Sequence, residues 1–379
     1  MTVTIEKVEA ISLRDPQAGD HRFEGSYQNV VVVVHGNNGE IGIGESDAPP
    51  SVIKAIIDMP DYNSLAGGLG HILTGQKVDD PGRLAQDMYD RTQWFGRNGV
   101  VIHAMSALDI AIWDLFARSQ GKPLHGVLGV KHHDRLPVYA TIYPLEDDVD
   151  KITAQVTPLL GAGFRHLKVC VEPWWQDRAL VARNLTHLRH IVGPDLGLML
   201  DVALEFRKFE ELSPFLPLLE DLGFSWIEAP FPLDNLTDHI KLKAATHIPI
   251  GVGDLGMTTC KEFVPYLAAR AFDIAQPDLT MFGGLSEARN LASMLAQTGR
   301  RIIPHAYNTD ITIAANLHFL ATLPEAGLIE FSTSNSRLRR KLAHGLGGID
   351  SDGMIAVPDT LGLGLTLNQR LIEETRGRV

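Results

Sequence analysis

The fold is decided by LGLMLDV at residues 196–202, SWIEAP at 225–230 and PIGVGD at 249–254. Each segment is a short apolar run, typical of a buried strand, and each carries one acidic residue near its end. The three acids, Asp201, Glu228 and Asp254, follow one another at spacings of 27 and 26 residues. A strand, a helix and their loops need about that many residues. We therefore expect three consecutive βα units with an acid at the same end of each strand.

Similar segments lie on both sides of these three. They are LPVYATI (136–142), HLKVCV (166–171), DIAQPD (273–278), RIIPHA (301–306) and LIEFS (328–332). Stretches with the apolar period of an amphipathic helix lie between them, at 176–192, 210–222, 259–269 and 285–297. Alternating strands and helices predict a parallel sheet, and eight strands at a period near 25 residues predict a closed (β/α) barrel of the α/β class.

The N-terminal part of the chain has a different pattern. Residues 3–13 alternate between apolar and polar, and a Gly-Asn-Asn-Gly turn at 36–39 joins the valine-rich run 29–35 to a further strand at 40–44. The stretch 79–120 has a helical period throughout. These patterns predict an α+β domain in front of the barrel.

We predict three parts along the chain. They are an N-terminal α+β capping domain at 1–130, the (β/α) barrel at 131–345, and a loop-rich C-terminal segment at 346–379 that returns to the capping domain.

Composition narrows the classes of function. The net charge of −12 without any Lys/Arg run argues against nucleic-acid binding, and it means that an anion site needs local cations or a metal. Only two cysteines, Cys170 and Cys260, argue against a disulfide framework. The sequence contains no run of about 18 apolar residues, so we expect no membrane span, and residues 1–13 do not resemble a signal peptide. We expect a cytoplasmic homo-oligomer that acts on a small molecule.

The three strand-end acids have a common chemical explanation. The carboxyl ends of barrel strands converge on one mouth, where three carboxylates would repel each other unless a hard cation lay between them. Mg²⁺ prefers such oxygen ligands. A single acid of this kind would be an ordinary surface residue, but three on consecutive strands favour one divalent ion bound by Asp201, Glu228 and Asp254.

The series continues on the next strands with Asp278, His305 and Glu330, at spacings of 24, 27 and 25 residues. A carboxylate hydrogen-bonded to an imidazole fixes its tautomer and raises its basicity, so Asp278 and His305 are typical of a general base. A buried structural His–Asp pair is the alternative. Lys168, in HLKVCV, is expected to point into the same mouth, where it would neutralise a substrate carboxylate or act as a base. An ordinary strand-end lysine explains it equally well.

The chain resembles the mandelate racemase subgroup of the enolase superfamily over essentially its whole length. The matching stretches are IGIGES (41–46), ALDIAIWDLFARSQGKPLHGVLG (107–129), LMLDV (198–202), WIEAPF (226–231), QPDLTMFGGLSEA (276–288) and IPHAYNT (303–309). The resemblance implies a modified (β/α)7β barrel, in which the first barrel strand pairs less regularly than in an ideal eightfold barrel. It also implies that Asp201, Glu228 and Asp254 bind Mg²⁺, that Asp278 and His305 form the family's dyad, and that Glu330 polarises the substrate carboxylate.

Three residues depart from the family's pattern. The family's second barrel strand commonly carries Lys-x-Lys, whereas this chain has Lys168-Val169-Cys170, and an unactivated thiol is a poor base at neutral pH. Ala203 replaces an asparagine that often follows the first metal ligand, and Asp254 is a glutamate in many relatives. The loss of the second lysine argues against a two-base racemase.

The function that this pattern favours is Mg²⁺-dependent removal of the α-proton of a carboxylate, most simply the dehydration of a sugar acid to a 2-keto-3-deoxy acid. Racemisation or epimerisation and lactone cycloisomerisation are alternatives within the family. Two alternatives belong to other classes of function. GVGDLG at 251–256 matches a dinucleotide-binding fingerprint, which would indicate an NAD-dependent oxidoreductase. A barrel can also serve only as a binding module without catalysis.

Substrate specificity should depend on the loops that cover the barrel mouth, at about 15–30 and 46–55. Candidate substrate contacts, for which surface or packing roles are equally good explanations, are His21, Arg22, Tyr27, Tyr143, Cys170 and Trp175.

Overall fold

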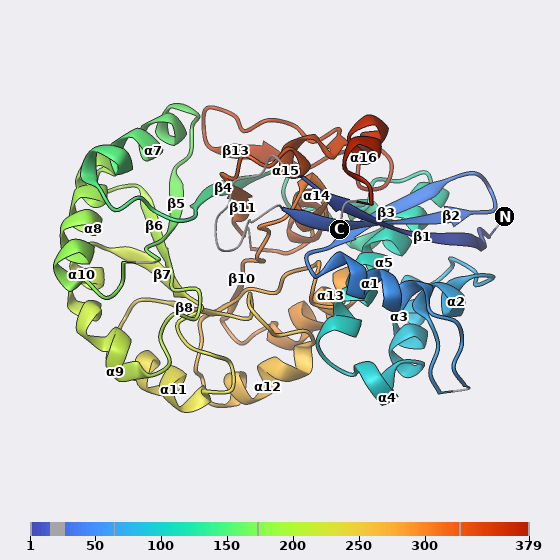
Figure 1. Cartoon of the computed structure of the whole chain (residues 1–379), viewed down its shortest axis with the longest axis horizontal. Helices are drawn as coiled ribbons and strands as arrows, with labels where there is room; N and C mark the ends of the chain where they lie inside the picture. Colours follow the sequence, from blue (N-terminus) through green and yellow to red (C-terminus); the bar gives the residue numbers. More distant parts are fainter. Residues whose placement is uncertain (1, 16–26, 64, 173, 326, 378–379) are drawn as a thin grey trace.

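The computed structural model describes residues 2–15, 27–63, 65–172, 174–325 and 327–377. Figure 1 shows a ring of strands and helices on the left, which contains the middle of the chain, and a smaller part on the right, which contains its N-terminal third. We call these parts the barrel and the cap. The predicted α/β barrel with an α+β cap is confirmed.

All eight predicted barrel strands are present, and they are parallel. They are β4 (Arg135–Ile142), β5 (His166–Cys170), β6 (Gly197–Asp201), β7 (Phe224–Glu228), β8 (Ile250–Val252), β9 (Ile274–Ala275), β10 (Arg301–Ile302) and β11 (Ile329–Ser332). Each strand from β4 to β9 pairs with the next one in the chain, and β11 pairs with β4. The register is also as expected, because Asp201 stands opposite both Cys170 and Glu228.

The irregular part of the barrel is the seam between β10 and β11. These two strands do not pair in the described part of the chain, whereas β4 pairs with β5, β11 and, in antiparallel fashion, β13 (Met354–Ala356). The expectation that the first barrel strand would be the irregular one was therefore wrong. Pro277 and Pro304 follow β9 and β10 closely, and because proline has no N–H it cannot continue a ladder there.

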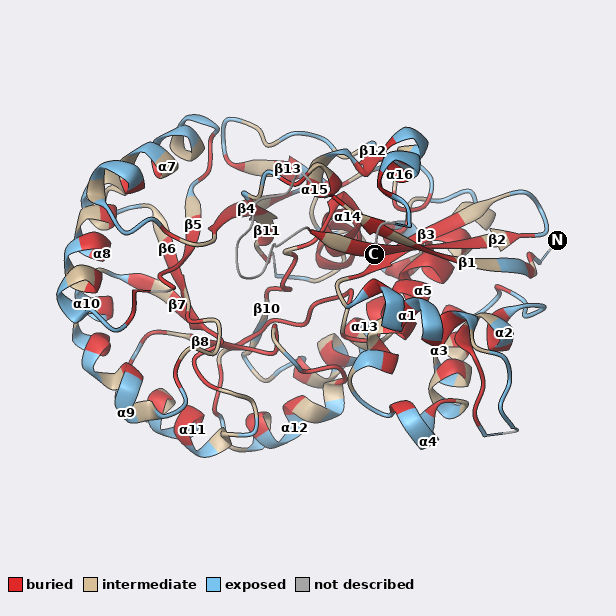
Figure 2. Cartoon of the chain, viewed as in Figure 1, coloured by how far each residue is buried: buried red, intermediate tan, exposed pale blue. Residues whose placement is uncertain are grey.

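Helices cover the outside of the barrel, and most of them have one side buried against the strands and the other side exposed (Figure 2), whereas the last of them, α14, is buried along its whole length. They are α7 (Val149–Gly161), α8 (Arg178–Val192), α9 (Phe209–Leu212), η1 (Ser213–Phe215), α10 (Leu216–Asp221), α11 (Leu236–Ala245), α12 (Cys260–Ala268), α13 (Gly284–Leu295) and α14 (Asp310–Ala321). The helix predicted at 210–222 is broken into three pieces, because Pro214 and Pro217 lack the N–H groups of a continuous helix. Inside the barrel, the floor below the mouth is filled by Tyr139, Met199, Trp226, Ile274 and Ile303.

The cap combines a three-stranded antiparallel sheet with a layer of helices. The strands are β1 (Ile5–Arg14), β2 (Gln28–Gly36) and β3 (Ile41–Ser46), and the helices are α1 (Pro50–Asp58), α2 (Leu69–Leu73), α3 (Pro81–Asp90), α4 (Gln93–Gly96), α5 (Val100–Ser119) and α6 (His125–Leu128). The single helical stretch predicted at 79–120 is instead α3, α4 and α5, and Gly99 begins α5 with a φ of +71°.

Helix α5 is the central element of the cap. It packs against β3 and β2 on one side and contacts α13 of the barrel on another. In the described residues it is the one helix long and apolar enough to cross a membrane, but 83% of that apolar window is buried inside the protein. Its composition therefore fits a core helix that joins the cap to the barrel.

The C-terminal segment contacts both parts. Its elements are α15 (Arg337–Lys341), β12 (Ala343–His344), β13, β14 (Thr366–Leu367) and α16 (Gln369–Thr375). Strand β13 extends the barrel sheet, while Gly377 N–H donates to Ser12 O at 3.1 Å and Arg376 pairs with Glu9 at 2.7 Å in the cap. The division at about residues 130 and 345 stays a prediction.

Candidate active site

The three strand-end acids meet at the mouth of the barrel. Asp201 ends β6, Glu228 ends β7, and Asp254 follows β8 by two residues. One carboxylate oxygen from each lies within 4.8 Å of the others. Asp201 is further fixed by the Ala203 N–H, which donates to its Oδ1 at 2.8 Å. The backbone at Ala203 has a φ of +50°, a strained conformation of the kind that clusters at functional sites.

The electrostatics of this triad fit a bound cation. Burial, followed by the charges of Glu228 and Asp201, raises the pKa of Asp254 well above its usual value. Burial likewise raises the pKa of Asp201 to about 6, although the Lys168 cation opposes that shift. Acids that repel each other in a buried site are stabilised as carboxylates by a hard divalent ion, and their oxygens are the ligands that Mg²⁺ prefers.

Lys168 points into the same mouth, as expected from its place on β5. Its fully buried ammonium contacts Glu228 Oε1 directly and lies 2.9 Å from Glu330 Oε1 and 3.7 Å from Asp201 Oδ2. Burial opposes its charge, but Glu228 and Glu330 raise the pKa of Lys168 well above its usual value. It is therefore a fixed positive charge in the barrel mouth.

The second carboxylate oxygen of Glu228, Oε2, accepts two hydrogen bonds from side chains inside the barrel. Trp226 Nε1 donates to Glu228 Oε2 at 3.0 Å, and Gln276 Nε2 donates to the same oxygen. Gln276 can reach this position because residue 251 is glycine: a Cβ there would lie 1.8 Å from Gln276 Oε1. This support orients a candidate metal ligand through groups that would not touch the metal.

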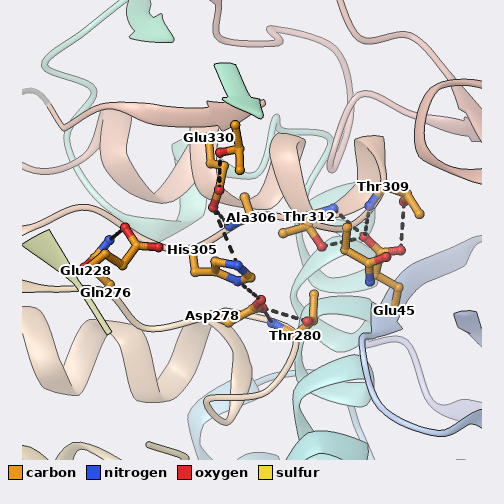
Figure 3. Close-up of polar contacts among 12 residues, drawn as sticks. Glu45, Glu228, Gln276, Asp278, Thr280, His305, Ala306, Thr309, Thr312 and Glu330 are labelled. Atoms are coloured by element: carbon orange, nitrogen blue, oxygen red, sulfur yellow. Dashed lines mark hydrogen bonds and ion pairs between the residues drawn. The ribbon is translucent and has the colours of Figure 1, made fainter. Parts of the chain in front are cut away.

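His305 and Asp278 form the predicted pair on the other side of the mouth (Figure 3). His305 Nδ1 lies 2.7 Å from Asp278 Oδ2, and Asp278 Oδ1 accepts from the N–H and the hydroxyl of Thr280 at 2.7 and 2.6 Å. An imidazole that donates from Nδ1 to a carboxylate presents Nε2 as the basic atom. The geometry therefore suits a general base that acts through Nε2.

Glu330, the second residue of β11, connects the two halves of the mouth. It accepts from Thr141 Oγ1 and from the Ala306 N–H at 2.7 Å, and His305 Nε2 lies 3.8 Å from its Oε2 (Figure 3). Burial opposes its charge, yet the Lys168 and His305 cations lower the pKa of Glu330 to about 2. Glu330 is thus a buried carboxylate in contact with both Lys168 and His305.

A cavity of about 270 Å³ lies over these groups. Its lining consists of Tyr27, Asp47, Thr141, Tyr143, Lys168, Asp201, Ala203, Asp254, Leu255, Met281, His305, Tyr307, Glu330 and Arg339. Its polar and charged walls and its small volume suit a small polar molecule rather than a large apolar one.

The predicted substrate contacts fall into three groups. Tyr27 and Tyr143 line the cavity. Cys170 and Trp175 do not: Cys170 is fully buried at the end of β5, and Trp175 packs against the rings of Phe206 and Phe215. His21 and Arg22 lie outside the described residues.

The sequence analysis missed Asp47, Tyr307 and Arg339. Asp47 directly follows β3, and burial followed by the Asp278 charge raises its pKa to about 7, while the Arg339 cation opposes the shift. Arg339 belongs to α15 in the C-terminal segment. An arginine in the run RLRRK gives no sign of burial, because arginine is rarely inside a protein. For Tyr307 the sequence did hold a signal, because this polar residue lies two positions after His305, the predicted base.

Glu45, on β3 of the cap, was matched only as part of a motif, but it joins the cap to the barrel behind His305. Its carboxylate accepts from Thr309 Oγ1 at 2.7 Å, from the Thr312 N–H at 2.8 Å and from Asn29 Nδ2 at 2.8 Å (Figure 3). Asn29 Nδ2 also donates to Asn308 Oδ1 at 2.9 Å, and Tyr27 donates to the same oxygen. This buried network fixes Tyr27 relative to the segment that carries His305.

The glycines at 251–256 do not form a dinucleotide site. After β8, the next helix, α12, begins only at Cys260, so these glycines do not lie on a tight turn that opens a helix. Asp254 in their middle is a member of the acidic triad.

Comparisons with known proteins agree with this geometry. Residues 12–129 match the family described as the mandelate racemase / muconate lactonizing enzyme N-terminal domain, and residues 151–371 match the enolase C-terminal domain-like family. The chain is 31% identical to arabinonate dehydratase of Saccharolobus solfataricus, over 87% of this chain and 92% of that protein. It is 26% identical to D-galactarolactone cycloisomerase of Agrobacterium fabrum, over 92% and 91%. The 3,6-anhydro-D-galactonate cycloisomerase structure from Zobellia galactanivorans superposes with a TM-score of 0.88 at 25% identity, covering 99% and 100%.

Proposed function

The chain belongs to the enolase superfamily, in its mandelate racemase and muconate lactonizing branch, and we propose that it dehydrates a sugar acid to a 2-keto-3-deoxy acid. The observation that carries the proposal is the shared mouth: the acidic triad, Lys168 and the His305–Asp278 pair all border one small polar cavity. The relatives named above, a dehydratase and cycloisomerases of sugar-acid derivatives, support this choice of substrate class.

Asp201, Glu228 and Asp254 are proposed to hold one Mg²⁺. When bound, the ion supplies positive charge for the substrate carboxylate and thereby makes the α-proton more acidic. Lys168 adds a second, fixed positive charge on the same side, because Glu228 and Glu330 keep it protonated.

His305 is proposed as the base. Its Nε2 accepts the α-proton of the substrate, while its Nδ1 donates to Asp278, which stabilises the imidazolium that forms. Cleavage of the C–O bond at the β-carbon then releases the hydroxyl group with the proton of His305 as water. The enol that remains becomes the 2-keto-3-deoxy acid.

One base is proposed to be sufficient. Direct inversion of the α-carbon needs a base on each face, but Cys170 does not line the cavity, and Lys168 has no lone pair while it is charged. Lactone cycloisomerisation also needs only one base, so it is the second candidate, favoured by the cycloisomerase relatives. The expectations of a cytoplasmic location and of a homo-oligomer stay predictions.

A panel of sugar acids and their lactones in D₂O tests the proposal. We expect exchange or elimination of the α-proton from one α-configuration, with formation of a keto acid, loss of both after EDTA treatment, and recovery with Mg²⁺. His305→Asn should stop both processes, whereas the matched variant Cys170→Ala should keep a substantial rate. Full activity after chelation, or rapid exchange of both epimers, would show that the proposal is wrong.

A further inference from the structure

The proposed reaction uses only one side of the cavity. The acidic triad, Lys168, His305 and Glu330 surround the place of the substrate carboxylate and its α-carbon. The remaining wall is formed by Tyr27 and Asp47 of the cap, by Arg339 of α15, and by Tyr307 of the segment between β10 and α14. These groups have no part in the proton transfer, so their chemistry indicates what the rest of the substrate carries.

Arg339 is a buried cation held between two aromatic rings. The residue is 1% exposed, and its guanidinium carbon lies 4.4 Å from the ring centroid of Tyr27 and 4.0 Å from that of Tyr307. Stacking on tyrosine rings uses the flat faces of a guanidinium and leaves its N–H groups to donate in the guanidinium plane. Arg339 therefore offers the cavity a rigidly oriented set of donors.

Asp47 offers the same wall an acceptor. It directly follows β3, and it lines the cavity together with Arg339. The two side chains come from opposite ends of the chain, Asp47 from the cap and Arg339 from α15, yet both line the same cavity. A ligand in the cavity is therefore offered a carboxyl group and a guanidinium on the wall away from the acidic triad.

A hydroxyl group fits such a pair, because it donates through its hydrogen and accepts through its lone pairs. It can bond to Asp47 whether that residue is ionised or protonated. A carboxylate has only acceptors, so beside an ionised Asp47 it would be repelled.

We propose that Asp47 and Arg339 form a hydroxyl-binding subsite, which selects sugar acids with one carboxylate and an uncharged polyhydroxylated tail (aldonates) over sugar acids with a carboxylate at both ends (aldarates). This inference rests on the proposed function and specifies its substrate. It assigns Asp47 and Arg339 to substrate specificity and leaves the proton transfer to His305.

The test compares matched substrate pairs: each six-carbon aldonate with the aldarate of the same configuration, which differs only at C6. We measure kcat/KM for keto-acid formation and for α-proton exchange in D₂O. For the configuration that the enzyme accepts, the aldonate should exceed its aldarate by about tenfold or more, the size expected when a buried charge is left unpaired or repelled.

Two variants locate the selectivity. Asp47→Asn keeps the shape but removes the charge, so the aldonate should lose about tenfold in kcat/KM while the aldarate does not, and their ratio should approach one. Arg339→Lys keeps the charge but loses the planar donors, so KM for the aldonate should rise with little change in kcat. Asp61→Asn, an exposed position of the cap that pairs with Arg91 at 3.0 Å, makes the same charge change away from the cavity and should leave the ratio unchanged.

Thermal unfolding of each variant separates misfolding from a change in specificity, and Asp47→Asn remains decisive if Arg339→Lys does not fold. Preference for aldarates in the wild type, or an unchanged ratio in Asp47→Asn, would overturn the inference while the proposed function stands. If no sugar acid of either kind exchanges its α-proton, the proposed function itself fails and the inference fails with it.

Discussion

At the residue scale, the barrel mouth is organised by the one lysine among its acids. Lys168 contacts Glu228 and Glu330 and lies near Asp201, and all four groups are largely or fully buried. Removing one member of a buried charge cluster leaves the others without compensation and typically costs about 3–5 kcal/mol. Lys168 thus has two consequences: it permits a dense set of carboxylates, and it keeps a positive charge beside the substrate.

Replacing Lys168 with methionine tests this role. Lys168→Met should lower kcat/KM about 100-fold or more, because the substrate carboxylate loses a positive charge, whereas Mg²⁺ binding measured by titration calorimetry should persist. Lys241→Met, at a lysine that is 44% exposed on α11, is the control and should have normal kinetics. Unchanged kcat/KM in Lys168→Met would contradict the role.

The pH dependence of the reaction should be set by His305. Burial opposes its charge, but the Glu330 carboxylate and the hydrogen bond and charge of Asp278 raise the pKa of His305 to about 10. A base must be neutral to accept a proton, so kcat/KM should rise with pH. The midpoint of this rising limb of the pH profile should lie above the usual histidine pKa of about 6.5. A bound divalent ion would repel the imidazolium and place the limb below 10.

Asp278→Asn should move that limb to lower pH and also lower the maximal rate, because the imidazolium loses its charged partner. Asp273→Asn removes a charge just before β9, at the opposite end of the strand, and should not shift the limb. A pH profile of kcat/KM for the three proteins decides the matter: if the limb of Asp278→Asn coincides with that of the wild type, His305 does not control it.

At the scale of elements, the site depends on the contact between β3 of the cap and α14 of the barrel. Glu45 accepts from the N–H groups of Thr309 and Thr312 at the start of α14, and from Asn29 Nδ2 on β2. A carboxylate at a helix N-terminus satisfies N–H groups that have no partner within the helix. This contact ends within a few residues of His305, and through Asn308 it also reaches Tyr27.

Glu45→Gln should loosen this contact, since an amide places a donor where a carboxylate oxygen accepted. We expect the free energy of unfolding to fall by about 1–3 kcal/mol and KM to rise. A double-mutant cycle with Tyr27→Phe, followed through KM, should show coupling, because Glu45 acts on the substrate through Tyr27. Glu6→Gln, exposed on β1, is the control, and strict additivity of Glu45→Gln with Tyr27→Phe would refute the link.

At the scale of the whole molecule, the cap and the barrel are also joined by two buried histidines. His125 of α6 stacks on His318 of α14 with 5.3 Å between ring centroids, and the His125 N–H donates to His318 Nδ1 at 3.1 Å. Burial lowers the pKa of His318 to about 3. This histidine is therefore neutral in the folded protein but takes up a proton in the unfolded chain below pH 6.5.

The sign of the effect on stability follows. Because the unfolded chain binds more protons, this histidine makes stability fall as the pH decreases from 6.5 toward 3, by about 2 kcal/mol between pH 6.5 and pH 5. His318→Gln should remove that part of the acid sensitivity, as urea unfolding at the two pH values would reveal, whereas His190→Gln at an exposed position of α8 should not. Equal pH dependence in His318→Gln and the wild type would argue against a neutral buried His318.

The sequence by itself determined the repeating part of this protein. Strands and helices have local periods, and a barrel places the carboxyl ends of its strands at one mouth, so acids spaced by one βα unit predicted the triad and the His305–Asp278 pair. Only the tertiary structure decided what the non-repeating segments contribute. Asp47, Glu45 and Arg339 come from the cap and from α15, and no period relates these segments to the barrel strands. Their positions depend on how the domains pack. Packing within the barrel places Cys170 and Trp175 outside the cavity wall.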